Sequence, residues 1–428
     1  MMGVLVLLFL LLLFMGLPIA YVLGCVAVVG IMLLQGIPLI TVVQRMFSGL
    51  NSFTLLAVPL FIFAANIMNR GKISDKLIDF AVSAVGHVRG GLGYANILVS
   101  MLFAGISGSS QADTAGIGKV LIPGMMKEGY TKETAVGVTA ASSTIGIIIP
   151  PSIPMVIYSS VANASIGALF LAGIIPGILI GCGQMAIVYF KAKKHNYKKH
   201  ERVPFKKVLK LGLLNLPALL TPVIIIGGVI TGIATATESA TVACVYATIL
   251  AVLLFKTIKI RDLGELLVDT LRTSAISLFA LATANALGQL LSYYQVNGIV
   301  ADFFTNSIPY KSMFILITIG FFLFIGTFMD AIPAMILFVP VLLPIAINFG
   351  ISSVQLGLLI VITLAVGQVT PPYGLCLLIA GKIANMSVHK AFVAVIPYIL
   401  VSVVVVILIA FFPDIAFFIP KLLKPNWF

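Results

Sequence analysis

Charged residues are scarce in this sequence. Only 9% of its 428 residues are Asp, Glu, Lys or Arg, against about 25% in soluble globular proteins. Among the charged residues, acids are half as frequent as bases, with 13 Asp and Glu against 26 Lys and Arg. The four cysteines include no CxxC pair, which predicts small core residues and neither a metal site nor a disulfide framework. Together these shortages exclude an ordinary soluble enzyme.

Long uncharged segments take the place of the missing charge. Hydrophobic residues make up 61% of the chain, and its mean hydropathy is +1.18. Residues 134–190 and 331–381 contain no Asp, Glu, Lys or Arg. Because a membrane-spanning helix needs about 20 apolar residues, we predict an all-α polytopic membrane protein. Residues 4–14 lack the basic start and the cleavage site of a signal peptide, and we expect them to form the first membrane helix.

One loop sets the predicted orientation in the membrane. Residues 191–210 hold nine Lys and Arg against a single acid, Glu201, and such loops stay in the cytoplasm. The same rule accounts for the net charge of +13, so no nucleic-acid partner is predicted. Counting outward from this loop gives roughly nine full crossings, with the N-terminus inside and the C-terminus outside.

Two further apolar segments, residues 92–126 and 311–348, are too broken to cross simply. Each is long enough to enter the membrane and return, and each has small or polar residues at its middle, at 105–110 and 326–330. Irregular backbone at membrane depth is tolerated only where protein encloses it or where it lines a cavity. We therefore predict two re-entrant helical hairpins.

The hairpins belong to an internal repeat. At a shift of 221 residues the Gly and Pro positions coincide: Gly105 with Gly326, Pro123 with Pro344, Gly129 with Gly350, Gly146 with Gly367, Pro150 and Pro151 with Pro371 and Pro372, and Pro176 with Pro397. Ala162 and Asn163 match Ala384 and Asn385 at a shift of 222. An odd number of crossings separates the two copies, so they are expected to be inverted, as in secondary transporters. Tandem duplication in a structural membrane protein is the alternative.

Each repeat also contains a Pro-Pro step. Proline removes a backbone donor and disfavours helix at the preceding residue, so Ile149 and Thr370 should be unwound. Carbonyls near residues 146–149 and 367–370 would then lack helical partners. A dehydrated cation such as Na⁺ can bind such carbonyls, and the N-terminus of a half-helix can bind an anion. A proline kink without a ligand is the alternative.

Three acids lie inside apolar segments, where an unpartnered charge is costly, so each is a functional candidate. Asp330 is the strongest, because it lies at the second hairpin tip, where Ser109 lies in the first. Asp113 follows the first tip by one helical turn and could instead be a cap or a hairpin brace. For Glu238, which begins a helix, capping competes evenly with a functional role.

An enzymatic interpretation of the first tip is rejected. Residues 105–108 have the GxSG form of an intramembrane serine protease nucleophile, which needs a general base beside Ser107. All four histidines fall in predicted loops or at segment ends, and no lysine lies at that depth. We therefore predict that the protein is not an enzyme.

Several motifs together resemble a known family. Residues 15–24 (MGLPIAYVLG) and 233–243 (IATATESATVA) carry the resemblance, to which residues 105–118, 147–152, 326–333 and 369–374 add. Over essentially its whole length, the chain resembles the large membrane subunit of TRAP (tripartite ATP-independent periplasmic) transporters, within the ion-transporter superfamily of elevator proteins. Ala236 stands where the family often has Pro.

The resemblance implies an inverted-repeat, elevator-type symporter in the bacterial inner membrane. It implies Na⁺-driven import of an organic acid, of the C4-dicarboxylate or sialic acid class, delivered by a periplasmic substrate-binding protein (P-type). It also implies a small four-helix membrane subunit (Q-type) that this chain does not contain. A stand-alone Na⁺- or H⁺-coupled carboxylate symporter of the same fold is the alternative.

Carried onto this sequence, the resemblance implies at least two Na⁺ ions and a substrate site between the hairpin tips. The first sodium site would involve the tip, Ser107 to Ser110, with Gly146, Ile149 and Pro150. The second would involve Gly326, Thr327, Gly367 and Thr370. Substrate would lie near Ser109, Ser110, Ser152 and Asp330.

The predicted organisation alternates scaffold and transport segments. Residues 1–90 would hold scaffold helices and a first arm helix at 73–88, and residues 91–165 the first transport half. Residues 166–310 would hold further scaffold helices and a second arm helix at 297–309. Residues 311–388 would form the second transport half, and residues 389–428 the last helix and the C-terminus.

Overall fold

The computed structural model describes residues 2–34, 36–308 and 310–425. Every regular element in those ranges is helical, and seven helices are long and apolar enough to cross a membrane. Six shorter apolar helices of 10–17 residues accompany them. The prediction of an all-α, multi-pass membrane protein is confirmed. The ends of predicted segments at residues 1, 309 and 428 lie outside the described ranges.

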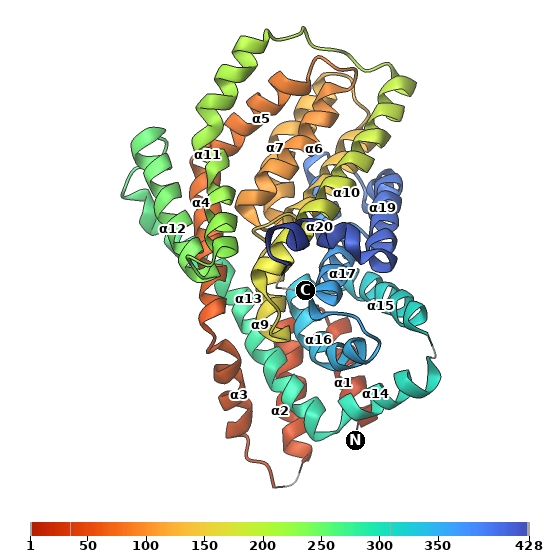
Figure 1. Cartoon of the computed structure of the whole chain (residues 1–428). Helices are drawn as coiled ribbons and strands as arrows, with labels where there is room; N and C mark the ends of the chain where they lie inside the picture. The colour runs from red at the N-terminus through yellow and green to blue at the C-terminus, as the bar shows by residue number, and fades with distance from the viewer. Residues whose placement is uncertain (1, 35, 309, 426–428) are drawn as a thin grey trace.

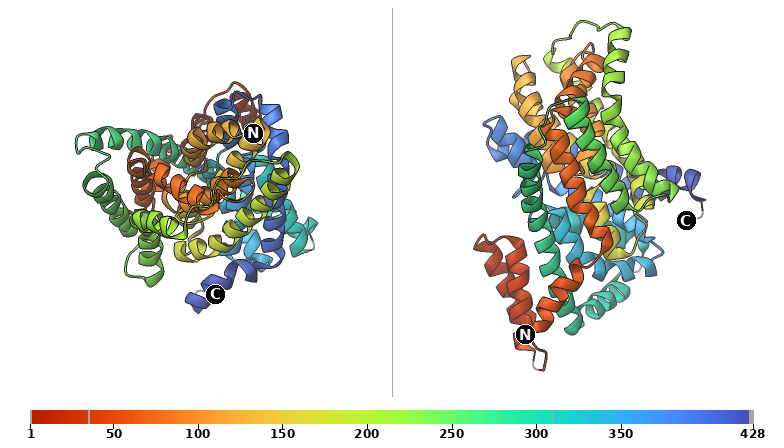
Figure 2. Two further views of the ribbon diagram at one scale, coloured as in Figure 1. Left: turned by 90° about the horizontal axis from the view of Figure 1, so that it is seen from above. Right: turned by 90° about the vertical axis from the view of Figure 1, so that its left-hand side faces the viewer.

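The first helices lie at one end of an elongated molecule (Figures 1 and 2). They are α1 (Met2–Phe14), α2 (Ile19–Leu33) and α3 (Ile40–Leu50). A 3₁₀ turn, η1 (Phe53–Leu56), then leads into α4 (Ala57–Arg70) and α5 (Ile73–Val85), which run toward the other end (Figure 1). The start of α1 lies at the opposite end from the basic linker that joins α10 (Ile166–His195) to α11 (Phe205–Thr231). With that linker inside, the predicted inside N-terminus is wrong. The first Lys or Arg is Arg45, so the positive-inside rule had no charge with which to orient α1 and α2.

Two series of five helices follow the same order. The first comprises α6 (Gly91–Ser107), α7 (Ser110–Lys127), α8 (Lys132–Ser143), α9 (Ile153–Ala162) and α10. The second comprises α15 (Lys311–Gly326), α16 (Ala331–Asn348), α17 (Ser353–Gly367), α18 (Leu375–Ile383) and α19 (Val388–Phe411). Their starts, residues 91, 110, 132, 153 and 166 against 311, 331, 353, 375 and 388, differ by 220 to 222 residues. The helix order therefore recurs at the spacing of the Gly and Pro pattern.

Both Pro-Pro steps interrupt a helical path, as predicted. α8 passes into a 3₁₀ turn, η2 (Thr144–Ile147), and both Ile149 and Thr370 lie outside the helices. The peptide bonds that join the two prolines of each step are cis. Asn163 follows α9 directly, and Asn385 lies two residues beyond the end of α18. Both have a φ of 49°, a left-handed conformation that Asn tolerates at helix ends.

The remaining helices connect and flank the two series. They are α11, α12 (Ala236–Ile249) with the π-helical turn η3 (Leu250–Leu254), α13 (Asp262–Tyr293), α14 (Val296–Ser307) and α20 (Pro413–Leu423). The long helix α13 packs against α2, α3 and α4 on one side and against α16 on another. α10 packs against α6, α17, α19 and α20. The two hairpins, α6–α7 and α15–α16, bring their tips to the middle of the molecule (Figure 1).

The inversion of the two hairpins is tested by cysteine accessibility. Single cysteines at Met126, near the base of the first hairpin, and at Ser312, near the base of the second, should react from the cytoplasm and from the outside respectively. Cys25 and Cys182 are exposed, so all four native cysteines are first replaced by serine. Labelling of both positions by a membrane-impermeant maleimide added to one side only contradicts the inverted repeat.

Candidate functional site

The two hairpin tips line one cavity of about 140 Å³. Ser109 and Gln111 line it from the first hairpin and Asp330 from the second, while Gln368 enters from the segment after α17. Residues of α4 and α13, among them Asn66 and Ser277, close the opposite wall. The Gln111 side-chain amide donates a hydrogen bond to Asp330 Oδ1 at 3.3 Å, so the structure joins the two tips directly.

The local sequence explains how the first tip turns. α6 ends at Gly108, whose φ of +59° is left-handed and therefore suits glycine. A Cβ at Gly108 would also lie 2.8 Å from the Pro151 carbonyl oxygen. Ser109 then adopts an extended conformation and caps α7, its Oγ accepting from the Ala112 amide at 3.4 Å. The short polar tip thus ends one helix and starts the next.

A cluster of oxygen atoms lies behind the first tip. Ser107 Oγ donates to Asp113 Oδ1, and the Asp113 side chain is fully buried. Asp113 Oδ2 and the nearby Ser110 Oγ are buried without a hydrogen-bond partner among the described residues. A Cβ at Gly146 would collide with Asp113 Oδ2, so the carboxylate lies directly against the unwound segment. Asp113, for which the sequence left capping and bracing open, here joins two predicted sodium-site residues.

The chemistry of this cluster suits a hard cation. Its atoms are carboxylate and hydroxyl oxygens, the ligands that hard cations prefer. No group of three or more His, Cys, Asp or Glu able to hold a metal occurs in the described ranges, so a transition-metal centre has no support there. A buried carboxylate without a cationic partner is costly, and no salt bridge within residues 2–34, 36–308 and 310–425 includes Asp113.

The first Pro-Pro step uses its side chains to hold the broken helix. Ser152 Oγ donates to the Ile147 carbonyl at 2.6 Å and accepts from the Met155 amide at 3.3 Å, which caps α9. Ser152 is fully buried and is not part of the cavity lining, so the structure does not bring this predicted substrate residue to the cavity. Ile149 packs instead against Gly177 of α10, where a Cβ would collide with its side chain. Pro150 is buried, with its carbonyl oxygen 3.7 Å from where a Gly105 Cβ would lie.

The residues of the predicted second sodium site, Gly326, Thr327, Gly367 and Thr370, lie where two backbone segments approach closely. A Cβ at Gly367 would lie 2.5 Å from Gly326 Cα, so only glycine lets α15 and α17 meet here. The Thr327 carbonyl accepts from the Tyr373 amide at 3.0 Å, and the Gly367 carbonyl from the Thr370 amide at 3.0 Å. The Gly367 carbonyl therefore has no α-helical partner, as expected, since residue 371 is proline, but a tight turn supplies the Thr370 amide in its place.

Asp330 caps α16 and gathers donors from three elements. Its Oδ1 accepts from the Ala331 amide at 2.8 Å, from Gln368 Nε2 at 2.9 Å and from Gln111 Nε2 at 3.3 Å. These donors belong to the second hairpin, to the second Pro-Pro step and to the first hairpin. Asp330 therefore organises the point at which both tips and one broken helix meet.

Among the candidate acids, Glu238 has a local role away from the tip cavity. Glu238 forms a capping box with Thr235, its carboxylate accepting from the Thr235 amide at 2.7 Å, so capping is the role that the structure supports. At the first tip, Ser107 donates to Asp113, and among the described residues no histidine lines the tip cavity.

Comparison with known proteins places the chain among transport proteins. The family model described as "Tripartite ATP-independent periplasmic transporter, DctM component" matches residues 6–415. The sialic acid TRAP transporter large permease protein SiaM of Vibrio cholerae is 37% identical over 415 residues, covering 96% of each chain. The C4-dicarboxylate TRAP transporter large permease protein DctM of Pseudomonas aeruginosa is 33% identical over 383 residues, covering 90% of this chain and 88% of its own. Among solved structures, the YdaH transporter of Alcanivorax borkumensis shares the fold with a TM-score of 0.60 at 16% identity, covering 87% of this chain and 88% of that one.

Proposed function

The chain belongs to the DctM component family of the tripartite ATP-independent periplasmic transporters, and from that premise we propose that it couples the import of an organic acid anion to sodium. It is a multi-pass protein of the bacterial inner membrane. The observation that carries the sodium proposal is the buried, unpartnered Asp113 Oδ2 beside Gly146, Ser107 and Ser110. A bound cation would supply the partner that this oxygen lacks.

At least two sodium ions are proposed for each transport cycle. The first would bind between the first tip and Gly146, with Asp113 as its charged ligand. The second would bind where Gly326 and Thr327 meet Gly367 and Thr370, a contact that only glycines permit. This second site has no acid among its four residues, so it would depend on backbone and hydroxyl oxygens alone.

The tip cavity is the proposed substrate site. Ser109, Ser110 and the Gln111 and Gln368 amides offer hydrogen bonds there, which suit the carboxylate and hydroxyl groups of an organic acid. Sialic acid and C4-dicarboxylates are the proposed classes, because relatives at 37% and 33% identity are named for them. Positive charge from bound sodium would balance the anion beside Asp330.

Two partner proteins are part of the proposal. The family's description as tripartite and periplasmic supports a periplasmic substrate-binding protein that delivers the acid and a small four-helix membrane subunit. A stand-alone Na⁺- or H⁺-coupled symporter of the same fold is the second candidate. Uptake that proceeds at full rate without either partner would favour that candidate.

An elevator motion is proposed for the transport step. The hairpins and broken helices would move together, and α10 and α19 would move with them because α10 packs on α6, α17 and α19. This proposal extends the predicted transport segments at 91–165 and 311–388. Helices α1 to α4 and α11 to α13 would remain as the scaffold, with α5 and α14 as the arms between the two parts.

Uptake in proteoliposomes tests the proposed function. With both partner proteins supplied, uptake of sialic acid or succinate is expected to rise with external Na⁺ with a Hill coefficient above one. Replacing external Na⁺ by K⁺ is the matched control for ionic strength. Equally fast uptake in potassium medium, with sodium on neither side, contradicts the coupling.

A further inference from the structure

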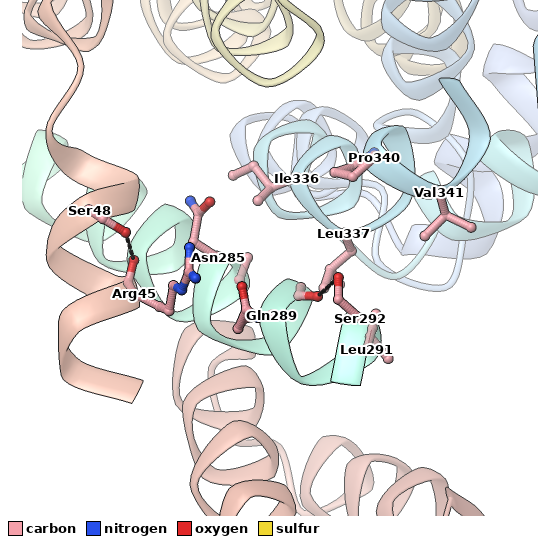
Figure 3. A pocket seen from close by; sticks show the side chains of 12 residues that line it. Arg45, Ser48, Asn285, Gln289, Leu291, Ser292, Ile336, Leu337, Pro340 and Val341 are labelled. Atoms are coloured by element: carbon pink, nitrogen blue, oxygen red, sulfur yellow. Dashed lines mark hydrogen bonds between the residues drawn. The ribbon is translucent and has the colours of Figure 1, made fainter. Parts of the chain in front are cut away.

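A second cavity, of about 220 Å³, lies between α3, α13 and α16 (Figure 3). Within the described part of the chain, the linings of the two cavities share no residue. Its wall on α13 mixes polar side chains with Ala284, Gly288 and Leu291, whereas its wall on α16, with Leu337 and Pro340, is apolar. The polar side chains of the lining are Arg45, Ser48, Asn285, Gln289 and Ser292.

The same helix, α13, lines both cavities in succession. Thr273 and Ser277 line the tip cavity, and Asn285 and Gln289 line the second one. These four residues spread over about 160° around the helix, because each step of four residues advances about 40°. At 1.5 Å per residue, Asn285 lies about 12 Å along the axis from Ser277. Polar side chains of α13 therefore line the two cavities one after the other along the helix axis.

Helix α16 follows the same course on the opposite side. Its first residues, Ala331 and Ile332, line the tip cavity, and Leu337 and Pro340 line the second cavity farther along. α13 and α16 pack against each other. The second cavity thus lies in the groove between these two helices, toward the end of the molecule that holds the start of α1 (Figure 1).

Arg45 brings an uncompensated positive charge to this cavity. No salt bridge within residues 2–34, 36–308 and 310–425 includes it, and its side chain extends from α3 toward α13 (Figure 3). In the described part of the chain, it is the only Lys or Arg that lines either cavity. The tip cavity contains the acid Asp330. Arg45 is therefore the one fixed positive charge that an anion would meet in the described linings of the two cavities.

The groups around Arg45 match a small carboxylate. A guanidinium offers a planar set of donors that binds a carboxylate through two parallel hydrogen bonds. Asn285 Nδ2 donates to the Leu281 carbonyl at 2.9 Å, which fixes the orientation of that amide. Gly49 lets α3 approach closely, because a Cβ there would lie 2.5 Å from the Asn285 amide. The apolar wall of α16 would cover the carbon skeleton.

We propose that this cavity is an outer subsite that binds the carboxylate of the transported acid through Arg45 before the acid reaches the hairpin tips. The proposal rests on the proposed function, since it takes the substrate to be an organic anion. Arg45 raises the local concentration of the anion at the mouth of the groove. Ser277, about 12 Å from Asn285 along the axis of α13, then lies at the tip cavity.

Uptake by Arg45 variants tests the subsite. In proteoliposomes with both partners, Arg45→Gln should raise the half-saturating concentration of the acid by at least about tenfold, the worth of a lost charge-assisted hydrogen bond. Arg45→Lys, which keeps the charge and loses the planar fork, should fall between Arg45→Gln and wild type. Sodium dependence should not change, since Arg45 is remote from the Asp113 cluster. Lys424→Gln, which removes the same charge elsewhere, should behave as wild type.

The outcomes separate this proposal from the proposed function and from lipid binding. Normal sodium-dependent uptake by Arg45→Gln, with unchanged half-saturation, overturns the subsite and leaves the transporter intact. A phospholipid headgroup presents similar anionic oxygens, so vesicles with and without phosphatidylglycerol are compared. An Arg45→Gln effect that appears only with phosphatidylglycerol assigns Arg45 to lipid and also overturns the subsite.

Labelling gives a readout that does not depend on transport. A single cysteine at Val341, on the α16 wall, is reacted with a negatively charged and with a positively charged methanethiosulfonate, in a background free of native cysteines. Arg45 should favour the anionic reagent by about fivefold or more through local attraction, Arg45→Gln should remove the preference, and succinate or sialic acid should slow the reaction. If the wild type and Arg45→Gln show the same preference between the two reagents, the proposal is contradicted, whether or not uptake is measured.

Discussion

Replacing Asp113 by asparagine is expected to abolish sodium-dependent uptake at low sodium while leaving the fold intact. Asparagine has the size of aspartate, so its packing beside Ser107 and Gly146 is kept, but the charge that would hold a buried cation is lost. Breaking a buried ionic contact costs about 3–5 kcal/mol, so the half-saturating Na⁺ concentration should rise at least about a hundredfold. Initial uptake rates over a sodium series, with KCl held complementary, measure the shift.

A matched variant and a binding measurement control this experiment. Asp302→Asn makes the same change of charge at an exposed residue of α14 and should leave the sodium dependence unaltered. Sodium should also raise the Tm of the wild type and of Asp302→Asn, because a ligand that binds only the native state stabilises it. If Asp113→Asn keeps both responses to sodium, Asp113 is a neutral brace of the hairpin and not a ligand.

The features of the fold that could be predicted from the sequence are those with local causes. Prolines 150, 151, 371 and 372 prevent a regular helix wherever the chain places them, so the two breaks were predictable without knowledge of packing. The same holds for the first tip, where Gly108 and Ser109 favour a left-handed turn followed by a cap. Hydropathy likewise determines the class, because buried backbone in a membrane must be helical or closed into a barrel.

The features that could not be predicted depend on contacts between distant segments. Asp113 meets Gly146 only because α7 packs against η2, and nothing near Asp113 in the sequence distinguishes a brace from a ligand. The family resemblance implies that Ser152 lies near substrate, whereas in the structure its hydroxyl donates to the Ile147 carbonyl and accepts from the Met155 amide. The cavity at Arg45 needs α3, α13 and α16 together, and only their packing reveals it.

The orientation of the first helices was predicted wrongly for a different reason. Topology from sequence rests on the distribution of Lys and Arg near helix ends, and the first 44 residues contain neither. A stretch without charge can be recognised as membranous but cannot be oriented by that rule.

Removing the side chain of Asp330 is expected to lower the maximal rate of uptake more than about tenfold, because three donors lose one acceptor. Each buried donor left without a partner costs about 1–3 kcal/mol, and these donors hold together both hairpins and the second Pro-Pro step. Asp330→Asn should cost less than Asp330→Ala, because its amide oxygen still accepts but without the strength of a charged acceptor. Half-saturation by the acid should change little in Asp330→Asn, since an anionic substrate gains nothing from direct contact with a carboxylate.

A double-mutant cycle with Gln111→Ala separates this organising role from substrate contact. If Asp330 acts by joining the tips through Gln111, Asp330→Ala and Gln111→Ala remove the same interaction, and the double variant should be barely slower than Asp330→Ala alone. Additive losses, or a large rise in half-saturation with an unchanged maximal rate, would instead place Asp330 against the substrate. Wild-type uptake driven by a proton gradient without sodium would contradict both roles and assign Asp330 as a proton carrier. The cycle thus tests whether the contact between the two hairpins, the feature that distinguishes this site from two separate kinked helices, is what transport requires.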